Sequence, residues 1–176
     1  MRHALKLHPD SRCDAVSGIE VEVARSANLL LRYVVTAKPG GLMIPPVVEP
    51  RRADELWRHT CFEAFFHEPS GDGYIEFNFS PSAEWAVYRL DGYRRGRRIA
   101  DDVPAPRITL LPNAKGFELH ASLELPHDSP WRLGLAAVIE ETNGRISYWA
   151  LKHPAGRPDF HHSDCFALEL AATLTP

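Results

Sequence analysis

The sequence has few cysteines, no long apolar run and no excess of basic residues, and each absence excludes a class of protein. Its three cysteines are an odd number without paired spacing, so a disulfide framework is not expected. No run approaches the roughly 18 apolar residues of a membrane-spanning helix. The first residues also lack the apolar stretch of a signal peptide. We therefore expect a cytoplasmic protein without a membrane partner.

The charge balance argues against nucleic acid as a partner. The formal net charge is -3, whereas a general nucleic-acid binder needs a basic excess. The one basic cluster, Arg94 to Arg98, lies between Asp91 on one side and Asp101 and Asp102 on the other. We interpret this cluster as a solvated, locally compensated turn. The expected partner is a small molecule.

Long amphipathic helices are also missing, and short strand-like runs, either alternating with period 2 or apolar throughout, take their place. Such runs occur at 4–7, 19–23, 28–36, 61–66, 74–80, 85–90, 108–111, 117–125, 133–141, 146–153 and 165–170. The run at 28–36 is apolar at nearly every position, which predicts a strand buried on both faces. About ten short strands joined by Pro/Gly turns predict an all-β fold, an antiparallel two-sheet β-sandwich of immunoglobulin-like class. At 176 residues the chain is expected to form a single domain, 1–176.

The chain is organised around a predicted hairpin between 61 and 80, with a turn at 69–73. Alternation places one set of apolar residues on a common face: Phe62, Ala64, Phe66, Ile75, Phe77 and Phe79. If this face packs in the core, Glu63, Glu76 and Asn78 must share the opposite face. Two carboxylates and an amide can hydrogen-bond the hydroxyl groups of a ligand without carrying out chemistry.

Two tryptophans are predicted to join this polar face. In the next strand Ala86, Tyr88 and Leu90 continue the core pattern, which leaves Trp85, Val87 and Arg89 on the polar face. Trp149 is placed there by the same argument, because Ile146, Tyr148 and Ala150 alternate with it. An indole is a flat amphipathic surface that suits stacking on a sugar ring.

The predicted ligand-binding residues also include neighbours of the hairpin and histidines of the C-terminal loop. The full set is Trp57, Arg58, Glu63, Glu76, Asn78, Trp85, Trp149, His153 and His161. No catalytic residue is assigned. The densest run of metal-ligand types, at 153–165, matches no known metal-site spacing, so no metal site is expected.

Two segments together suggest a family. The run LWRHTCFEAFFHEPSGDGYIEFNFSPSAEWAVYRLDGYR and the run YWALKHPAGRPDFHHSDCF resemble the DOMON-like β-sandwich domains related to family 9 carbohydrate-binding modules. The resemblance is strongest to small, stand-alone bacterial DOMON-like proteins and extends from about Val21 to the C-terminus. It implies a jelly-roll-like sandwich with a ligand groove on one sheet, binding sugars in some relatives and haem in others. It does not imply catalysis.

The main prediction is therefore a non-catalytic carbohydrate-binding β-sandwich without a cofactor, and two alternatives stay open. The first is a haem b protein, because some DOMON relatives hold haem between a Met and a His or Lys. Met43 is the only internal methionine, and the partner would be His153, His161, His162 or Lys152. The second is a glycoside-acting enzyme, which needs two carboxyl groups at a defined separation, here Glu63 and Glu76.

Overall fold

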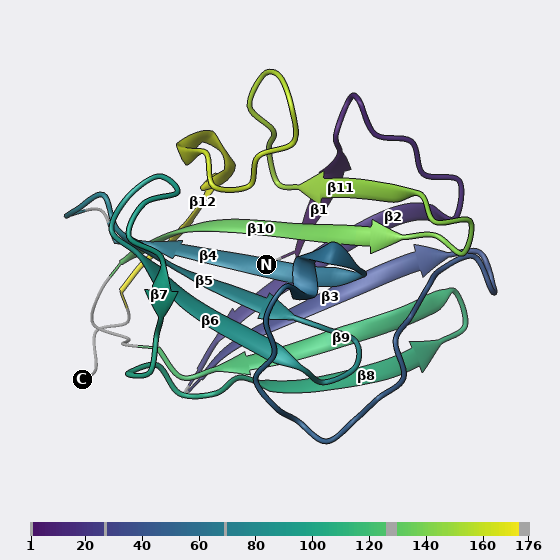
Figure 1. Ribbon diagram of the computed structural model, residues 1–176, viewed down its shortest axis with the longest axis horizontal. Coiled ribbons are helices and arrows are strands. Elements are labelled where there is room, and N and C mark those ends of the chain that lie inside the picture. The colour runs from purple at the N-terminus through teal and green to yellow at the C-terminus, as the bar shows by residue number, and fades with distance from the viewer. Residues whose placement is uncertain (1, 27, 69, 126–129, 173–176) are drawn as a thin grey trace.

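The computed structural model describes residues 2–26, 28–68, 70–125 and 130–172, and these contain twelve β-strands and two short 3₁₀ helices (Figure 1). The strands are β1 (Arg2–Leu7), β2 (Val16–Arg25), β3 (Leu29–Ala37), β4 (Cys61–His67), β5 (Tyr74–Phe79), β6 (Trp85–Leu90), β7 (Arg98–Ile99), β8 (Arg107–Asn113), β9 (Gly116–Leu123), β10 (Trp131–Glu140), β11 (Ile146–Ala150) and β12 (Leu168–Leu170). The helices are η1 (Leu56–Arg58) and η2 (Ser163–Cys165). Within the described ranges, neither helix has the length and apolar character needed to span a membrane.

All strands pair antiparallel in one continuous sheet, in the order β7-β6-β5-β4-β10-β11-β1-β2-β3-β9-β8, with β12 paired to the start of β10. Strand β1 joins the two halves, because it pairs with β11 on one side and with β2 on the other. The predicted all-β antiparallel class is confirmed. The sheet curls as a half-barrel, however, rather than separating into two sheets, and it has twelve strands rather than about ten.

The main core lies where the two halves of the curled sheet face each other. The ring of Tyr33 on β3 lies 5.0 Å from the ring of Phe62 on β4, and the ring of Phe117 on β9 lies 6.0 Å from that of Phe62. The Tyr33 hydroxyl, fully buried, donates to the backbone carbonyl of Glu63 at 2.9 Å. These contacts hold β4 against β3 and β9, so the opposite face of β4 points away from the main core.

The predicted faces of the central hairpin are confirmed. Its apolar set lies in the main core, with Phe62, Ala64, Phe66 and Phe79 at 0% exposure. Register pairs Glu63 with Asn78 and Phe65 with Glu76, so the polar groups share the other face of β4 and β5. That face is buried as well, because a second apolar cluster covers it, including Phe65, Tyr74, Phe160 and Phe166.

The predicted faces of β6 are wrong by one residue. Val87 lies opposite Phe77 and belongs to the main core, whereas Tyr88 lies opposite Glu76 on the polar face. Trp85 packs against the main core and does not face the polar groups. Period-2 alternation shows which residues share a face. It does not show which face lies in the main core when both faces are buried, because neither face then carries a run of polar residues.

The same error applies to Trp149. Trp149 on β11 lies opposite Ala137 and packs in the main core, where its indole N–H donates to the Ser147 hydroxyl at 3.1 Å. Tyr148, predicted to be core, instead shares the polar side of the sheet with Val138. Both faces of β10 and β11 are apolar here, so the sequence pattern did not fix which face is inside.

The prediction that 28–36 is buried on both faces is also wrong. In β3 the odd-numbered residues from Leu29 to Val35 are buried, but Leu30 is 38% exposed and Arg32 lies on an outer face. The Arg32 guanidinium forms ion pairs at 2.7 Å with Glu22 and with Glu118 on the neighbouring strands. Strand β3 therefore has one face in the main core and one face toward solvent.

Candidate functional site

The site is built on the outer face of β10, β4, β5 and β6. Register aligns Ala136, Glu63, Asn78 and Ala86 in one row across these strands. The polar pair in the middle is therefore flanked by two alanines, whose single methyl groups leave space above the sheet. Glu63 of this row and Glu76 on β5 form the floor of a cavity of about 340 Å³.

Two buried carboxyl groups lie on this floor. Glu63 and Glu76 are each 4% exposed. Asn78 donates to Glu76 Oε1 at 2.7 Å, whereas Glu76 Oε2 is buried without a hydrogen-bond partner in the described part of the chain. Burial raises the pKa of Glu63 well above its usual value and the Glu76 carboxylate raises it further, against the pull of Arg94 and Arg97. Burial also raises the pKa of Glu76, although the Asn78 hydrogen bond opposes this shift.

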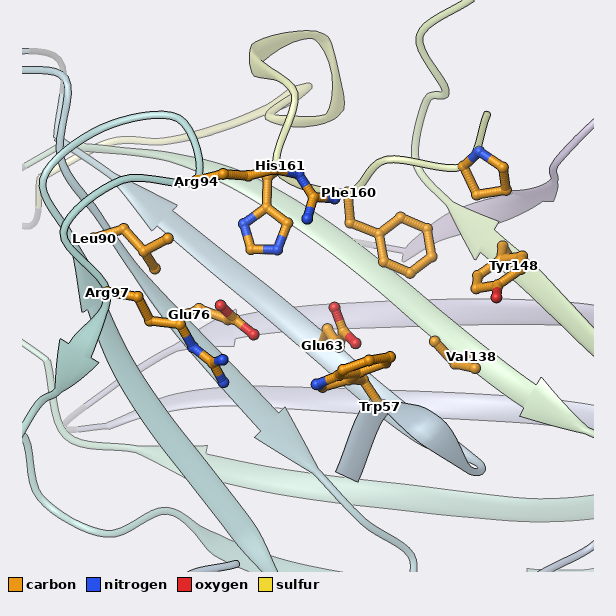
Figure 2. A pocket seen from close by; sticks show the side chains of 11 residues that line it. Trp57, Glu63, Glu76, Leu90, Arg94, Arg97, Val138, Tyr148, Phe160 and His161 are labelled. Atoms are coloured by element: carbon orange, nitrogen blue, oxygen red, sulfur yellow. The ribbon is translucent and has the colours of Figure 1, made fainter. Parts of the chain in front are cut away.

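Aromatic and aliphatic side chains form the walls (Figure 2). They are Trp57, Leu90, Val138, Tyr148, Pro158 and Phe160. The indole of Trp57 lies next to Glu63 in this view and comes from η1, on the segment that leads into β4. It is 44% exposed, so it lies at the mouth of the cavity. The Arg58 guanidinium lies over the ring of this indole, 5.5 Å from its centroid, and pairs with Glu55 at 2.9 Å.

The loop after β11 covers the site because β10 has a glycine beneath it. A Cβ atom at Gly134 would lie 2.8 Å from the Phe166 ring, so only glycine lets this ring approach the sheet. Phe166 then packs against Phe65 with 6.0 Å between ring centroids. This anchor holds the preceding residues, including Phe160 and His161, over the floor. Figure 1 shows the loop as the yellow-green segment beside β10 and β11.

Two arginines from the segment between β6 and β7 complete the mouth. Arg94 donates to Asp159 at 2.8 Å, and the Tyr93 hydroxyl donates to the same carboxylate at 2.5 Å. Burial alone would raise the pKa of Asp159, but these two hydrogen bonds hold it below its usual value. Arg97 lies over the Tyr88 ring at 3.7 Å. The arginine segment and the C-terminal loop are thus tied together across the cavity.

His161 supplies a neutral donor. Burial, with the nearby positive charge of Arg94, lowers the pKa of His161 to about 4. Burial raises the pKa of Tyr74 to about 12, so this phenol keeps its proton. The Tyr74 oxygen accepts from the Arg94 backbone N–H at 3.4 Å, and its own O–H is assigned as the donor to His161 Nδ1 at 2.8 Å. The remaining His161 proton is then on Nε2, which is available to a ligand.

The structure brings together four of the residues predicted from the sequence. Trp57, Glu63, Glu76 and His161 line the cavity. Asn78 does not line the cavity itself but lies beside these residues at 1% exposure, where its amide donates to Glu76. Their part in binding a ligand stays a prediction, but their common location is a feature of the structure.

The other predicted residues lie elsewhere. Trp85 and Trp149 pack against or within the main core, as described above. His153 interacts with the Lys6 backbone carbonyl at 2.8 Å, beside β1 rather than in the cavity. Arg58 contacts the Trp57 indole but does not line the cavity. None of these four lines the cavity.

Sequence reasoning missed several residues of the site. Arg94 and Arg97 were interpreted as part of a solvated turn, and Tyr148 was assigned to the core. Phe160 was not considered. The arginine cluster does carry a usable signal, because it directly follows β6, whose outer face adjoins the face of β4 and β5 that holds the buried carboxyl groups. Recognising it required knowing that the segment folds back over that face.

The location of Met43 bears on the haem alternative. The Met43 side chain is 48% exposed, and its backbone carbonyl accepts from the Thr60 hydroxyl at 2.8 Å. It is not among the residues that line the cavity, and haem b stays an untested prediction. Across the described ranges, no three residues of the types His, Cys, Asp and Glu come together as a metal site.

The fold and the cavity define an all-β protein with a ligand-sized pocket on the outer face of a curled antiparallel sheet. No family model and no curated protein sequence matches the chain. Among solved structures, it is similar to a Bacteroides uniformis protein provisionally described as carbohydrate-binding. The TM-score is 0.69 with 14% sequence identity, over 94% of this chain and 83% of that one. At this identity the likeness shows the fold alone.

Proposed function

We propose that this protein binds a carbohydrate, or a similar small polyhydroxylated molecule, in the cavity above Glu63 and Glu76. The observation that carries the proposal is the pair of buried carboxyl groups on the floor of an aromatic-walled pocket. Buried carboxyl oxygens without partners are costly in a folded protein unless a ligand satisfies them. Hydroxyl groups are suitable donors for them.

The hydrogen-bonding groups of the pocket match a polyol. Glu63 and the unpartnered Glu76 Oε2 act as acceptors, while Arg97, Arg94 and His161 Nε2–H act as donors. A sugar hydroxyl both donates and accepts, so it can interact with either group. The apolar faces of Trp57, Tyr148 and Phe160 suit the C–H face of a sugar ring.

The fold of the Bacteroides uniformis protein supports this proposal at the level of general class, because that protein is also described as carbohydrate-binding. The finer relation to DOMON-like domains and family 9 carbohydrate-binding modules is part of the proposal. It rests on the two sequence segments, and the second segment supplies Phe160 and His161 to the pocket.

The test is a binding screen with monosaccharides and short oligosaccharides, followed by isothermal titration calorimetry. Trp57→Ala and Arg97→Ala should each weaken binding about tenfold or more, since one stack or charged hydrogen bond is worth roughly 1.4 kcal/mol. Arg107→Ala is the matched control, because Arg107 is 82% exposed and outside the pocket. The proposal would be ruled out if no sugar binds, or if all three variants change the affinity of a bound sugar equally.

One observation also favours a second candidate, a glycoside-acting enzyme. Glu63 and Glu76 are on the same face of adjacent strands, and both have a raised pKa. Glycosidases use two carboxyl groups, one of them kept protonated as a general acid. Release of nitrophenol from nitrophenyl glycosides, abolished by Glu63→Gln and by Glu76→Gln, would establish this activity. A bound sugar recovered unchanged would leave binding as the function.

A further inference from the structure

The charges around the pocket floor are incompletely compensated. Glu63 and Glu76 are buried side by side, and no hydrogen bond to the Glu63 carboxyl group is found in the described residues. Only one carboxyl oxygen of Glu76 has a partner, the Asn78 amide. Two like-charged groups in this position repel each other unless a cation or a proton lies between them.

The protein cations near the floor are held elsewhere. Arg94 is engaged by Asp159 at 2.8 Å, and Arg97 stacks over the Tyr88 ring at 3.7 Å. Neither forms an ion pair with the floor carboxyl groups among the described residues, although both line the same cavity. Figure 2 shows Arg97 at the left of the pocket near Glu76 and Arg94 along the top beside His161, with Glu63 on the side of Trp57.

The other titratable groups that face the floor are neutral near pH 7. Burial lowers the pKa of His161 to about 4, and it raises the pKa values of Tyr74 and Tyr88 to about 12. Burial also raises the pKa of the Cys61 thiol, and the charge of Glu63 adds to this shift. The floor therefore lacks a direct cationic partner for its two carboxyl groups.

We propose, on the basis of the carbohydrate-binding function above, that the ligand is an amine-bearing polyol such as an amino sugar, with its ammonium group between Glu63 and Glu76. An ammonium is compact and carries three donors. Among the described residues no hydrogen bond involves the Glu63 carboxyl group, and Glu76 Oε2 has no partner, so both groups offer acceptors to these donors. The positive charge removes the repulsion between the carboxylates, which a neutral hydroxyl does not. The ring hydroxyls then face His161 and the arginines at the mouth.

The experiment compares glucosamine and galactosamine with glucose, galactose and N-acetylglucosamine by titration calorimetry at about pH 6.5, where a primary amine is protonated. The amines should bind about tenfold more tightly than the neutral sugars. Glu63→Gln should remove this advantage, because it weakens binding of the amines much more than binding of the neutral sugars. Glu20→Gln is the matched control, because its side chain is 47% exposed on β2. It should change nothing.

A second measurement does not depend on any variant folding. Binding of an ammonium lowers the pKa of both carboxyl groups, so the wild-type protein should release protons on binding, seen as heats that differ between buffers of different ionisation enthalpy. Neutral sugars that bind without an advantage for the amines, or amines that bind without proton release, would overturn the amine proposal and leave carbohydrate binding intact. Failure of every sugar to bind would overturn both.

Discussion

Glu63→Gln tests the buried carboxyl pair through stability alone, without any ligand. A carboxyl group whose pKa is raised in the folded state contributes most stability below its unfolded pKa, near 4.5, and loses it as pH rises through the folded pKa. Glutamine does not titrate, so the variant avoids this loss. The Tm of the variant minus the Tm of the wild type should therefore be larger at about pH 8 than at about pH 4, because the wild-type carboxyl group loses its stabilising effect as pH rises.

The size of the effect follows from the environment of Glu63. Each unit by which a pKa is raised corresponds to about 1.36 kcal/mol, and each kcal/mol shifts the Tm of a chain of this size by about 2–4 °C. The pKa of Glu63 is raised well above its usual value, so the change in Tm difference between the two pH values should be measurable. The free-energy cost of burying the glutamine amide is the same at both pH values, so it cancels when the two Tm differences are compared.

The assay is thermal unfolding followed by circular dichroism at several pH values, with Glu20→Gln as the exposed control. The control should stay within about 0.5 kcal/mol of wild type at every pH. A Tm difference for Glu63→Gln that is constant with pH, or that decreases toward pH 8, would refute the argument that this carboxyl group is buried with a raised pKa.

Four further predictions concern other parts of the molecule. Phe77→Ala, at 1% exposure in the main core, should cost about 3–5 kcal/mol in chemical denaturation, and a cost under about 1 kcal/mol would contradict its placement. Trp57→Ala should leave Tm nearly unchanged while Trp149→Ala destabilises the fold by about 3–5 kcal/mol, and the opposite order would reverse the assignment of site and core. Haemin titration should give no Soret band that Met43→Ala alters, because Met43 lies outside the pocket, and a stoichiometric Met43-dependent band would restore the haem alternative. Hydrogen bonds from Arg32 and His120 lower the pKa of Glu118 to about 2, so its stabilisation is present above its usual pKa and lost as pH falls toward 2. Glu118→Gln should therefore destabilise at pH 7 and converge with wild type in acid, and equal destabilisation at both pH values would exclude this ion pair as the cause.

The hairpin could be predicted from sequence because its two faces differ in kind. One face of β4 carries Phe62 and Phe66 while the other carries Glu63, and a one-residue shift would have put a carboxylate into the main core. The register of β5 then followed, with Glu76 and Asn78 beside Glu63. This reasoning located the floor of the pocket correctly.

The walls could not be predicted in the same way. Strands β6 and β11 are mostly apolar on both faces, with only Arg89 and Ser147 as polar residues. Alternation therefore showed which residues share a face but not which face lies in the main core, and Trp85 and Trp149 were exchanged with Tyr88 and Tyr148. A second core cluster on the outer face is the physical reason. The segments that cover this outer face are distant from β6 and β11 in the sequence or follow them as loops, so the strand pattern does not reveal them.

The arginines of the mouth illustrate the same limit. Local composition indicated a solvated turn, and Arg98 and Asp91 do form an exposed ion pair of that kind. Arg94 differs because Asp159, 65 residues later in the chain, holds it at the pocket. A contact at this separation has no local signature in a single sequence.

The most direct test of the proposed function is a crystal structure of the protein soaked with a sugar that the binding screen identifies. We predict density for a sugar ring beside the Trp57 indole, with a ring substituent in hydrogen-bond contact with Glu63 and with Glu76 Oε2. For an amino sugar, that substituent should be the amine. Density at another surface, with the cavity above Glu63 and Glu76 filled only by water, would contradict the assignment of this pocket as the carbohydrate site.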